Sequence, residues 1–98
     1  MNIEQKRNGN ALTIAPEGYL DTTTAPELKA VLESALDGVT ELTFDFEKLE
    51  YISSSGLRLL LLAQKTMNER GTMKVVRPND TIREIFEVTG FADVLTVE

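Results

Sequence analysis

Two kinds of apolar periodicity alternate along this chain, and this alternation most limits the folds open to it. Residues 42–46 alternate apolar and polar side chains, which is typical of a half-buried strand. Apolar residues recur every three or four positions in residues 28–36, before this strand, and again in residues 54–70, after it. Strand–helix–strand units of this kind predict parallel pairing through crossover connections, and therefore an α/β fold.

The other segments complete an expected order of β-β-α-β-α-β-α-β. Residues 3–7 and 11–15 predict an antiparallel hairpin, because Asn8-Gly9-Asn10 tolerates the positive φ of a tight turn. Residues 47–50 are interpreted as a polar connection. Residues 73–76 predict a short strand, and residues 94–97 a last strand or a short helix followed by a strand. The strands alternate instead of being apolar throughout, so the helices are expected mainly on one face of the sheet.

Residues 1–98 are accordingly expected to form one domain, with a mixed, mostly parallel sheet of four to five strands. Thr24 and Glu27 fit a capping box for the first helix, and Asn79 or Thr81 is expected to cap the third. The inner face of the third helix is predicted to carry Ile82, Ile85, Phe86 and Thr89. Gly71 and Gly90 are expected to stop the second and third helices.

Composition excludes several functional classes. The chain has no cysteine and no histidine, so disulfides, the common catalytic triads and imidazole-ligated metals are not expected. Its net charge of −6 has the wrong sign for binding nucleic acid or an anionic membrane. The first residues resemble no signal peptide, and the longest apolar run, Leu59–Ala63, is too short to span a bilayer. We therefore expect a cytoplasmic protein that is not an enzyme and that needs no metal or cofactor.

Three serines, Ser53-Ser54-Ser55, stand where an apolar, strand-like run meets the helix predicted for residues 54–70. Serine oxygens accept hydrogen bonds from the free N–H groups of a first helical turn, and the helix dipole attracts anions to the same place. A hydroxyl there is well placed to carry a phosphate. The alternative is that all three serines serve only as caps and turn residues.

The helix that follows the serines carries four consecutive leucines at positions 59–62. Successive residues of a helix are about 100° apart, so these side chains sweep roughly 300° and cannot all face one sheet. Leu59, Leu62, Ala63 and Thr66 define a second apolar face. This face either packs against a neighbouring helix or, with Arg58, forms part of a partner-binding surface beside Ser54.

Four segments together resemble the bacterial anti-sigma factor antagonists of the STAS domain family. They are Gly18–Asp21, Thr24–Leu28, Tyr51–Arg58 and Thr89–Phe91. The resemblance extends over essentially the whole chain, and the serine–glycine–leucine segment is its most specific part. It implies the STAS fold, with helices mostly on one face of a mixed sheet.

The resemblance also implies a partner-switching function. The unmodified protein would bind an anti-sigma factor that is also a serine kinase, and would thereby free a sigma factor for transcription. The kinase would use ATP to phosphorylate the antagonist and release it, and a PP2C-type phosphatase would restore the serine. By motif position the phosphorylated residue is Ser54. The residues implied in partner binding are Asp21, Thr22, Ser53, Ser55, Gly56 and Arg58.

Alternatives stay open within this resemblance. Ser53 stands where many family members carry Asp, and Ser55 is the other candidate acceptor. Asp21 either contacts a partner or only bonds the backbone N–H of Thr23 or Thr24. Some STAS domains are instead subunits of transport assemblies, for example for lipids, or bind small ligands. In such a protein the hydroxyl of Ser54 would be incidental.

Overall fold

A four-stranded sheet forms the centre of the protein in a computed structural model that describes residues 1–98. Its strand order is β1-β2-β4-β6. The β1–β2 pair is antiparallel, whereas β2–β4 and β4–β6 are parallel. The expected mixed, mostly parallel sheet is therefore confirmed. The strands are β1 (Ile3–Asn8), β2 (Ala11–Pro16), β4 (Glu41–Asp45) and β6 (Thr72–Val76).

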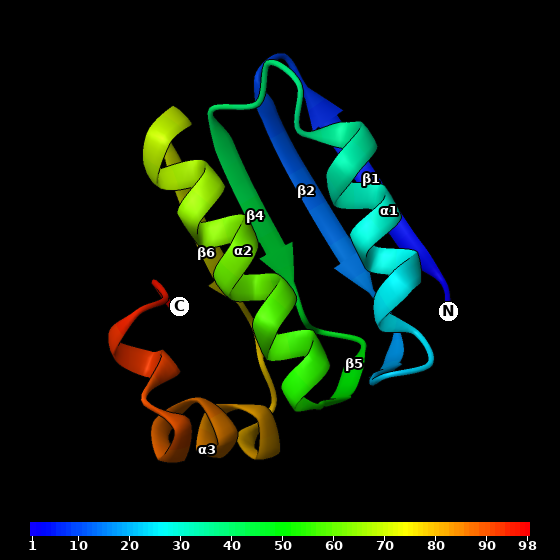
Figure 1. Cartoon of the computed structure of the whole chain (residues 1–98), viewed down its shortest axis with the longest axis vertical. Coiled ribbons are helices and arrows are strands. Elements are labelled where there is room, and N and C mark those ends of the chain that lie inside the picture. The colour runs from blue at the N-terminus through cyan, green and yellow to red at the C-terminus, as the bar shows by residue number, and fades with distance from the viewer.

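The two longest helices cover the same face of this sheet. Figure 1 shows α1 (Ala25–Ala35) and α2 (Ser54–Arg70) running side by side across it, and α3 (Asp80–Thr89) lying past the end of the strands. The short 3₁₀ helix η1 (Phe91–Asp93) follows α3. This arrangement confirms that the helices lie mainly on one face. None of these helices combines the length and the apolar character needed to cross a membrane.

Two further strands pair with each other outside the main sheet. They are β3 (Gly18–Leu20) and β5 (Leu49–Ile52), which form a parallel two-stranded ribbon. The interpretation of residues 47–50 as a polar connection was wrong at its end, because Leu49 begins β5 and is 1% exposed. The ribbon's register shifts between Gly18 and Tyr19, and β5 buries only its first and last residues. Such a strand lacks the alternation by which strands are recognised in sequence.

One hydrophobic cluster of 23 buried residues joins the sheet, the ribbon and the helices. Alternate side chains of β2 and β4 point into it, because successive residues of a strand face opposite sides. Phe44, Phe46 and Phe86 are its largest fully buried side chains. The ribbon contributes Leu20, Leu49 and Ile52 to this cluster, so the main sheet and the ribbon share one core.

The C-terminal segment departs from expectation in two places. The predicted last strand is reduced to one parallel bridge between Val97 and Val75, after the short helix η1. Thr89 was assigned to the inner face of the third helix but is exposed. Its hydroxyl donates instead to the carbonyl of Ile85, 2.6 Å away, one helical turn earlier. This bond satisfies the hydroxyl at the surface without burial.

An ion-pair network holds the segment that leads from β6 into α3. The guanidinium of Arg77 bonds the carboxylate of Asp45 and lies 3.0 Å from that of Glu47. The hydrogen bond from Arg77 holds the pKa of Asp45 below its usual value, although partial burial acts in the opposite direction. Arg77 has a φ of 57°, in the left-handed region that non-glycine residues rarely occupy. The paired carboxylates therefore anchor a strained turn.

Candidate functional site

The serines lie at the junction between the ribbon and α2. Ser53 has an extended backbone, and its N–H donates to the carbonyl of Leu20 at 2.8 Å, which continues the β3–β5 pairing. Its own carbonyl accepts from the N–H of Leu57 at 2.9 Å, the first intrahelical bond of α2. The helix therefore begins at Ser54, as predicted. Ser54 is exposed, so its hydroxyl is accessible to another protein.

The other two hydroxyls are engaged or hidden. Ser53 occupies the N-cap position, but its side chain makes no capping bond, and its oxygen is shielded from solvent without a hydrogen-bond partner. The alternative in which the serine side chains serve as caps therefore does not hold for Ser53. Ser55 is half-buried, and its hydroxyl lies 3.2 Å from the hydroxyl of Thr22. Of the three serines, Ser54 alone is exposed.

The loop before α1 is held next to the serines by Asp21. Its Oδ1 accepts from the backbone N–H of Thr23 at 2.9 Å and of Thr24 at 3.1 Å. The structural alternative for Asp21 is thus confirmed, whereas a direct partner contact stays a prediction. These bonds fix the loop that carries Thr22 to the hydroxyl of Ser55.

The predicted capping box at the start of α1 does not form. Thr24 is the N-cap residue, but its hydroxyl accepts from the N–H of Asp21 and donates to the carbonyl of Tyr19. The carboxylate of Glu27 instead accepts from the amino group of Met1 at 2.9 Å. Thr24 is therefore bonded within its own loop and Glu27 to a distant residue of the chain, so neither side chain is available for the box.

Gly56 lies beneath the serines, not at the surface. It is buried, and a Cβ at this position would stand 2.7 Å from Cγ1 of Ile52 and 2.8 Å from Cγ of Leu20. Only a glycine lets the first turn of α2 approach the ribbon this closely. Because Gly56 is covered by these side chains, the structure gives no support to a direct contact between Gly56 and a partner.

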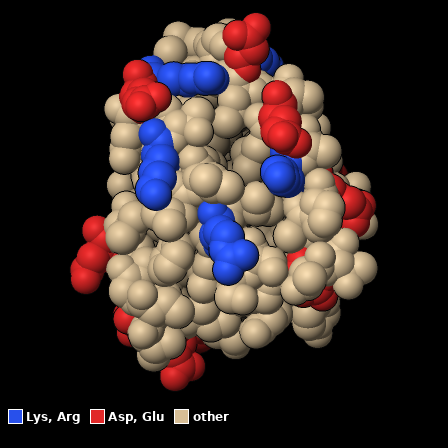
Figure 2. Space-filling model, in the orientation of Figure 1, with Lys and Arg blue, Asp and Glu red and all other residues tan.

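A shallow depression opens beside Ser55, between the starts of α1 and α2. Its lining contains two cations, Lys29 and Arg58, and no carboxylate, although the chain carries a net charge of −6. Figure 2 shows basic groups toward the middle of this face of the molecule and acidic groups mainly around its edge. The depression is lined by Thr22, Ala25, Pro26, Lys29, Ser55, Arg58, Leu59 and Leu62.

Lys29 was not singled out from the sequence. It lies on α1, far along the chain from the serines, and only the packing of α1 against α2 brings it to Arg58. A solvated lysine on a helix surface carries no local signal of such a neighbour. The spacing of apolar residues in α1 predicts which face is buried, but not which helix lies opposite.

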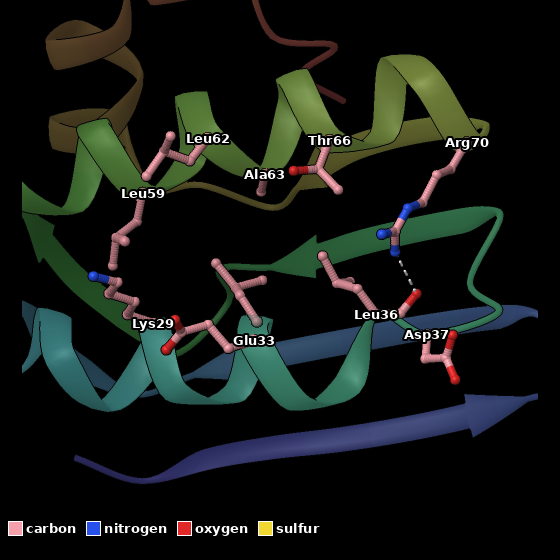
Figure 3. A pocket seen from close by; sticks show the side chains of 10 residues that line it. Lys29, Glu33, Leu36, Asp37, Leu59, Leu62, Ala63, Thr66 and Arg70 are labelled. Carbon is pink, nitrogen blue, oxygen red and sulfur yellow. Dashed lines mark hydrogen bonds between the residues drawn. The ribbon is translucent and has the colours of Figure 1, made fainter.

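The depression continues into a groove of about 430 Å³ along the two helices. Figure 3 shows Lys29 and Glu33 on α1 opposite Leu59 and Leu62 on α2. At the far end the guanidinium of Arg70 donates to the carbonyl of Leu36 at 3.1 Å and joins the helices.

The consecutive leucines divide between the two alternatives that the sequence left open. Leu59 and Ala63 are buried on the side of α2 that faces α1, so helix packing accounts for them. Leu62 is 51% exposed and lies one helical turn beyond Arg58. Helix packing does not account for Leu62, so the partner-binding alternative stays open for this residue.

The site contains no cluster of side chains that could ligate a metal ion. No group of three or more His, Cys, Asp or Glu side chains is arranged to hold an ion. What the serine region offers is one exposed hydroxyl at a helix N-terminus, next to a cationic depression. This arrangement can present a neutral surface to a protein and accept a phosphoryl group.

Comparisons with known proteins identify the family and the fold. Residues 2–98 match the family described as STAS domain. The anti-sigma-B factor antagonist of Staphylococcus aureus strain NCTC 8325 / PS 47 is 30% identical over 99% of this chain and 92% of its own length. The unphosphorylated anti-sigma factor antagonist SpoIIAA is similar in fold, with a TM-score of 0.85, 22% identity and coverage of 99% of this chain and 88% of SpoIIAA. Phosphorylated SpoIIAA of Bacillus, a cell fate determinant, gives a TM-score of 0.77 at 22% identity, covering 99% and 91%.

Proposed function

Because this chain belongs to the STAS domain family, we propose that it is an anti-sigma factor antagonist whose binding to an anti-sigma factor is switched off by phosphorylation of Ser54. In its unmodified form the protein binds an anti-sigma factor that is also a serine kinase. This binding frees a sigma factor for transcription. The observation that carries the proposal is the exposure of Ser54 at the start of α2, between two serines whose hydroxyls are hidden or engaged.

The switch is a phosphoryl transfer that the kinase performs. The oxygen of Ser54 attacks the γ-phosphorus of ATP, the O–H proton goes to the kinase or solvent, and ADP leaves. A PP2C-type phosphatase later hydrolyses the phosphoserine with water, which returns the serine and releases inorganic phosphate. The modification adds about −1.5 to −2 charges and three acceptor oxygens at neutral pH.

The fold tolerates this added charge. Ser54 is the first residue of α2, and the positive end of the helix dipole favours an anion there. The hydroxyl is exposed, so the phosphate stays in solvent and needs no burial. Phosphorylation therefore acts on binding, because a partner surface that fits a neutral hydroxyl has to desolvate or repel a dianion.

We assign the partner contact to the exposed groups around Ser54. These are Thr22, with the half-buried Asp21, on one side and Arg58 with Leu62 on the other, whereas the half-buried Ser55 has its hydroxyl against that of Thr22. Ser53 and Gly56 support the site from beneath, since the hydroxyl of Ser53 is shielded and Gly56 is buried.

Phosphorylation by an anti-sigma factor kinase from the same genome tests the acceptor. We expect incubation with kinase and ATP to add one phosphate to the wild-type protein and to Ser55→Ala, as measured by intact mass, and none to Ser54→Ala. Ser55→Ala is the matched control because it removes a neighbouring hydroxyl from the same helical turn. A phosphate that persists in Ser54→Ala would contradict the assignment to Ser54.

Binding tests the switch itself. We expect Ser54→Asp to keep the wild-type circular dichroism spectrum and to bind the anti-sigma factor more weakly, because it places a charge at the contact. Equal affinity of Ser54→Asp and wild type would contradict the proposal. A wild-type protein that takes up no phosphate and instead co-purifies with transport components would be a non-regulatory STAS subunit.

A further inference from the structure

Arg58 lies one helical turn beyond Ser54 on the same exposed side of α2. We propose that a phosphate on Ser54 captures the guanidinium of Arg58, so that phosphorylation also removes a cation from the partner surface. This inference rests on the proposed function and specifies how the added phosphate changes the surface that the partner binds. It concerns a residue of this chain and not a feature of the kinase.

The helix geometry places the two side chains within reach of each other. Residues four apart are neighbours on a helix surface, with Cβ atoms about 5–6 Å apart. An anion that precedes a cation by four residues is the favourable orientation along a helix. The planar guanidinium can donate two parallel hydrogen bonds to phosphate oxygens, which a lysine cannot do.

Arg58 is free to make this contact. Its side chain takes part in none of the hydrogen bonds or ion pairs of the structure, unlike Arg70 and Arg77, which are engaged. The depression that Arg58 lines contains no carboxylate. Asp21, in the neighbouring loop, already accepts two backbone N–H bonds. A phosphate one turn away therefore meets little competition for this guanidinium.

One further cation and the start of α2 define the surroundings of the pair. Lys29 lines the same depression from α1 and keeps it cationic, so Arg58 gains no neutralising partner there. The amino-terminal N–H groups of α2 favour the phosphate from its other side. The unmodified surface thus presents two cations beside a neutral hydroxyl. The phosphorylated surface presents a bulky anion with one of those cations turned toward it.

Phosphorylation consequently weakens the binding of the partner in two ways. An acidic group of the partner that pairs with Arg58 in the unmodified complex loses its cation, and the same group then faces the phosphate. Like charges brought together at an interface disfavour binding.

The test uses the full chain with phosphoserine installed at position 54 during translation. The second ionisation of the phosphate is followed by ³¹P NMR in wild type, Arg58→Gln and Lys65→Gln. A nearby cation favours the dianion, so we expect the titration midpoint to be higher in Arg58→Gln than in wild type by about 0.3 pH units. Lys65→Gln is the matched control, since it removes the same charge from an exposed position on α2.

The control defines what a general charge effect looks like. Residue 65 lies eleven positions from residue 54, or about 16 Å along the helix axis, farther than charges act at about 0.1 M salt. We expect its midpoint to equal that of wild type. Equal midpoints in wild type and Arg58→Gln, or the same rise in both variants, would overturn the inference.

A second variant separates charge from geometry. Arg58→Lys keeps the positive charge, so its titration midpoint should lie closer to that of wild type than to that of Arg58→Gln. The differences in midpoint between these proteins should shrink at about 1 M salt. An Arg58→Lys midpoint equal to that of Arg58→Gln would show that a positive charge does not suffice and that the paired hydrogen bonds of the guanidinium are required. The phosphate is installed without a kinase, so a failure here concerns Arg58 alone. Absence of kinase-dependent phosphate on Ser54 would refute the proposed function instead.

Discussion

At the scale of single residues, Gly56 determines how closely the serines approach the ribbon. Substitution to alanine normally stabilises a helix by about 1 kcal/mol, because it restricts the unfolded chain and improves helix propensity. Here the new methyl group would overlap Ile52 and Leu20, which are 1% and 0% exposed and cannot move into solvent. Packing therefore outweighs propensity at this position.

We predict that Gly56→Ala lowers the free energy of unfolding by about 1–3 kcal/mol, the usual cost of overpacking a core. Urea denaturation followed by circular dichroism measures the change. Ser54→Ala is the control, because Ser54 stands in the same helical turn with an exposed side chain and its substitution should stay within about 0.5 kcal/mol of wild type. A Gly56→Ala protein as stable as wild type would show that α2 can move away from the ribbon at little cost.

At the scale of elements, α2 and α3 begin in different ways. Asn79 caps α3 through its side-chain oxygen, which accepts from the N–H of Ile82 at 2.8 Å. Its amide group also donates to the carbonyls of Leu49 and Glu50, so the same residue fastens α3 to β5. Ser53 stands at the equivalent position of α2, but its hydroxyl is shielded and unpaired.

We predict opposite outcomes when the two cap residues are changed to alanine. Asn79→Ala should cost about 1–2 kcal/mol, because the helix loses its cap and the hydrogen bonds to the carbonyls of Leu49 and Glu50. Ser53→Ala should leave the stability unchanged or raise it, since it removes a hydroxyl that is desolvated without a partner. Thermal denaturation of both variants decides this. A loss of about 1 kcal/mol in Ser53→Ala would mean that its hydroxyl does cap the helix.

At the scale of the whole molecule, the ribbon and the main sheet depend on one another. They share no strand pairing, yet Leu20, Leu49 and Ile52 of the ribbon belong to the same buried cluster as Phe44 of the sheet. Neither part has a separate core. The ribbon holds the serines and the sheet holds the helices, so the geometry of the site requires both.

We predict that the ribbon and the rest of the protein unfold in one transition. The only two tyrosines, Tyr19 and Tyr51, both lie on the ribbon, with ring centroids 6.3 Å apart, and the chain has no tryptophan. Tyrosine fluorescence therefore reports on the ribbon, whereas circular dichroism at 222 nm reports mainly on the helices. The two urea curves should share one midpoint. An earlier fluorescence transition would reveal a ribbon that opens by itself.

The sequence alone determined the features that depend on neighbours along the chain. The bounds of α2, from Ser54 to Arg70, follow from the serines before it and from Gly71 after it, because the residues that start and stop a helix act on the neighbouring backbone. The central strands follow from their alternation, since one face is buried and the other is not. The same serine–glycine–leucine segment carried the family resemblance, which the match over residues 2–98 confirmed.

Tertiary structure alone decided what depends on distant partners. The pairing of β3 with β5 was missed because β5 buries only its first and last residues and so lacks the alternation that marks a strand, and because its partner lies about thirty residues away. The three serines look alike in sequence, yet one hydroxyl is shielded, one meets Thr22 and one is exposed. Lys29 joins Arg58 only because α1 packs on α2. Exposure and charge at the site arise from this packing, which no short-range pattern encodes.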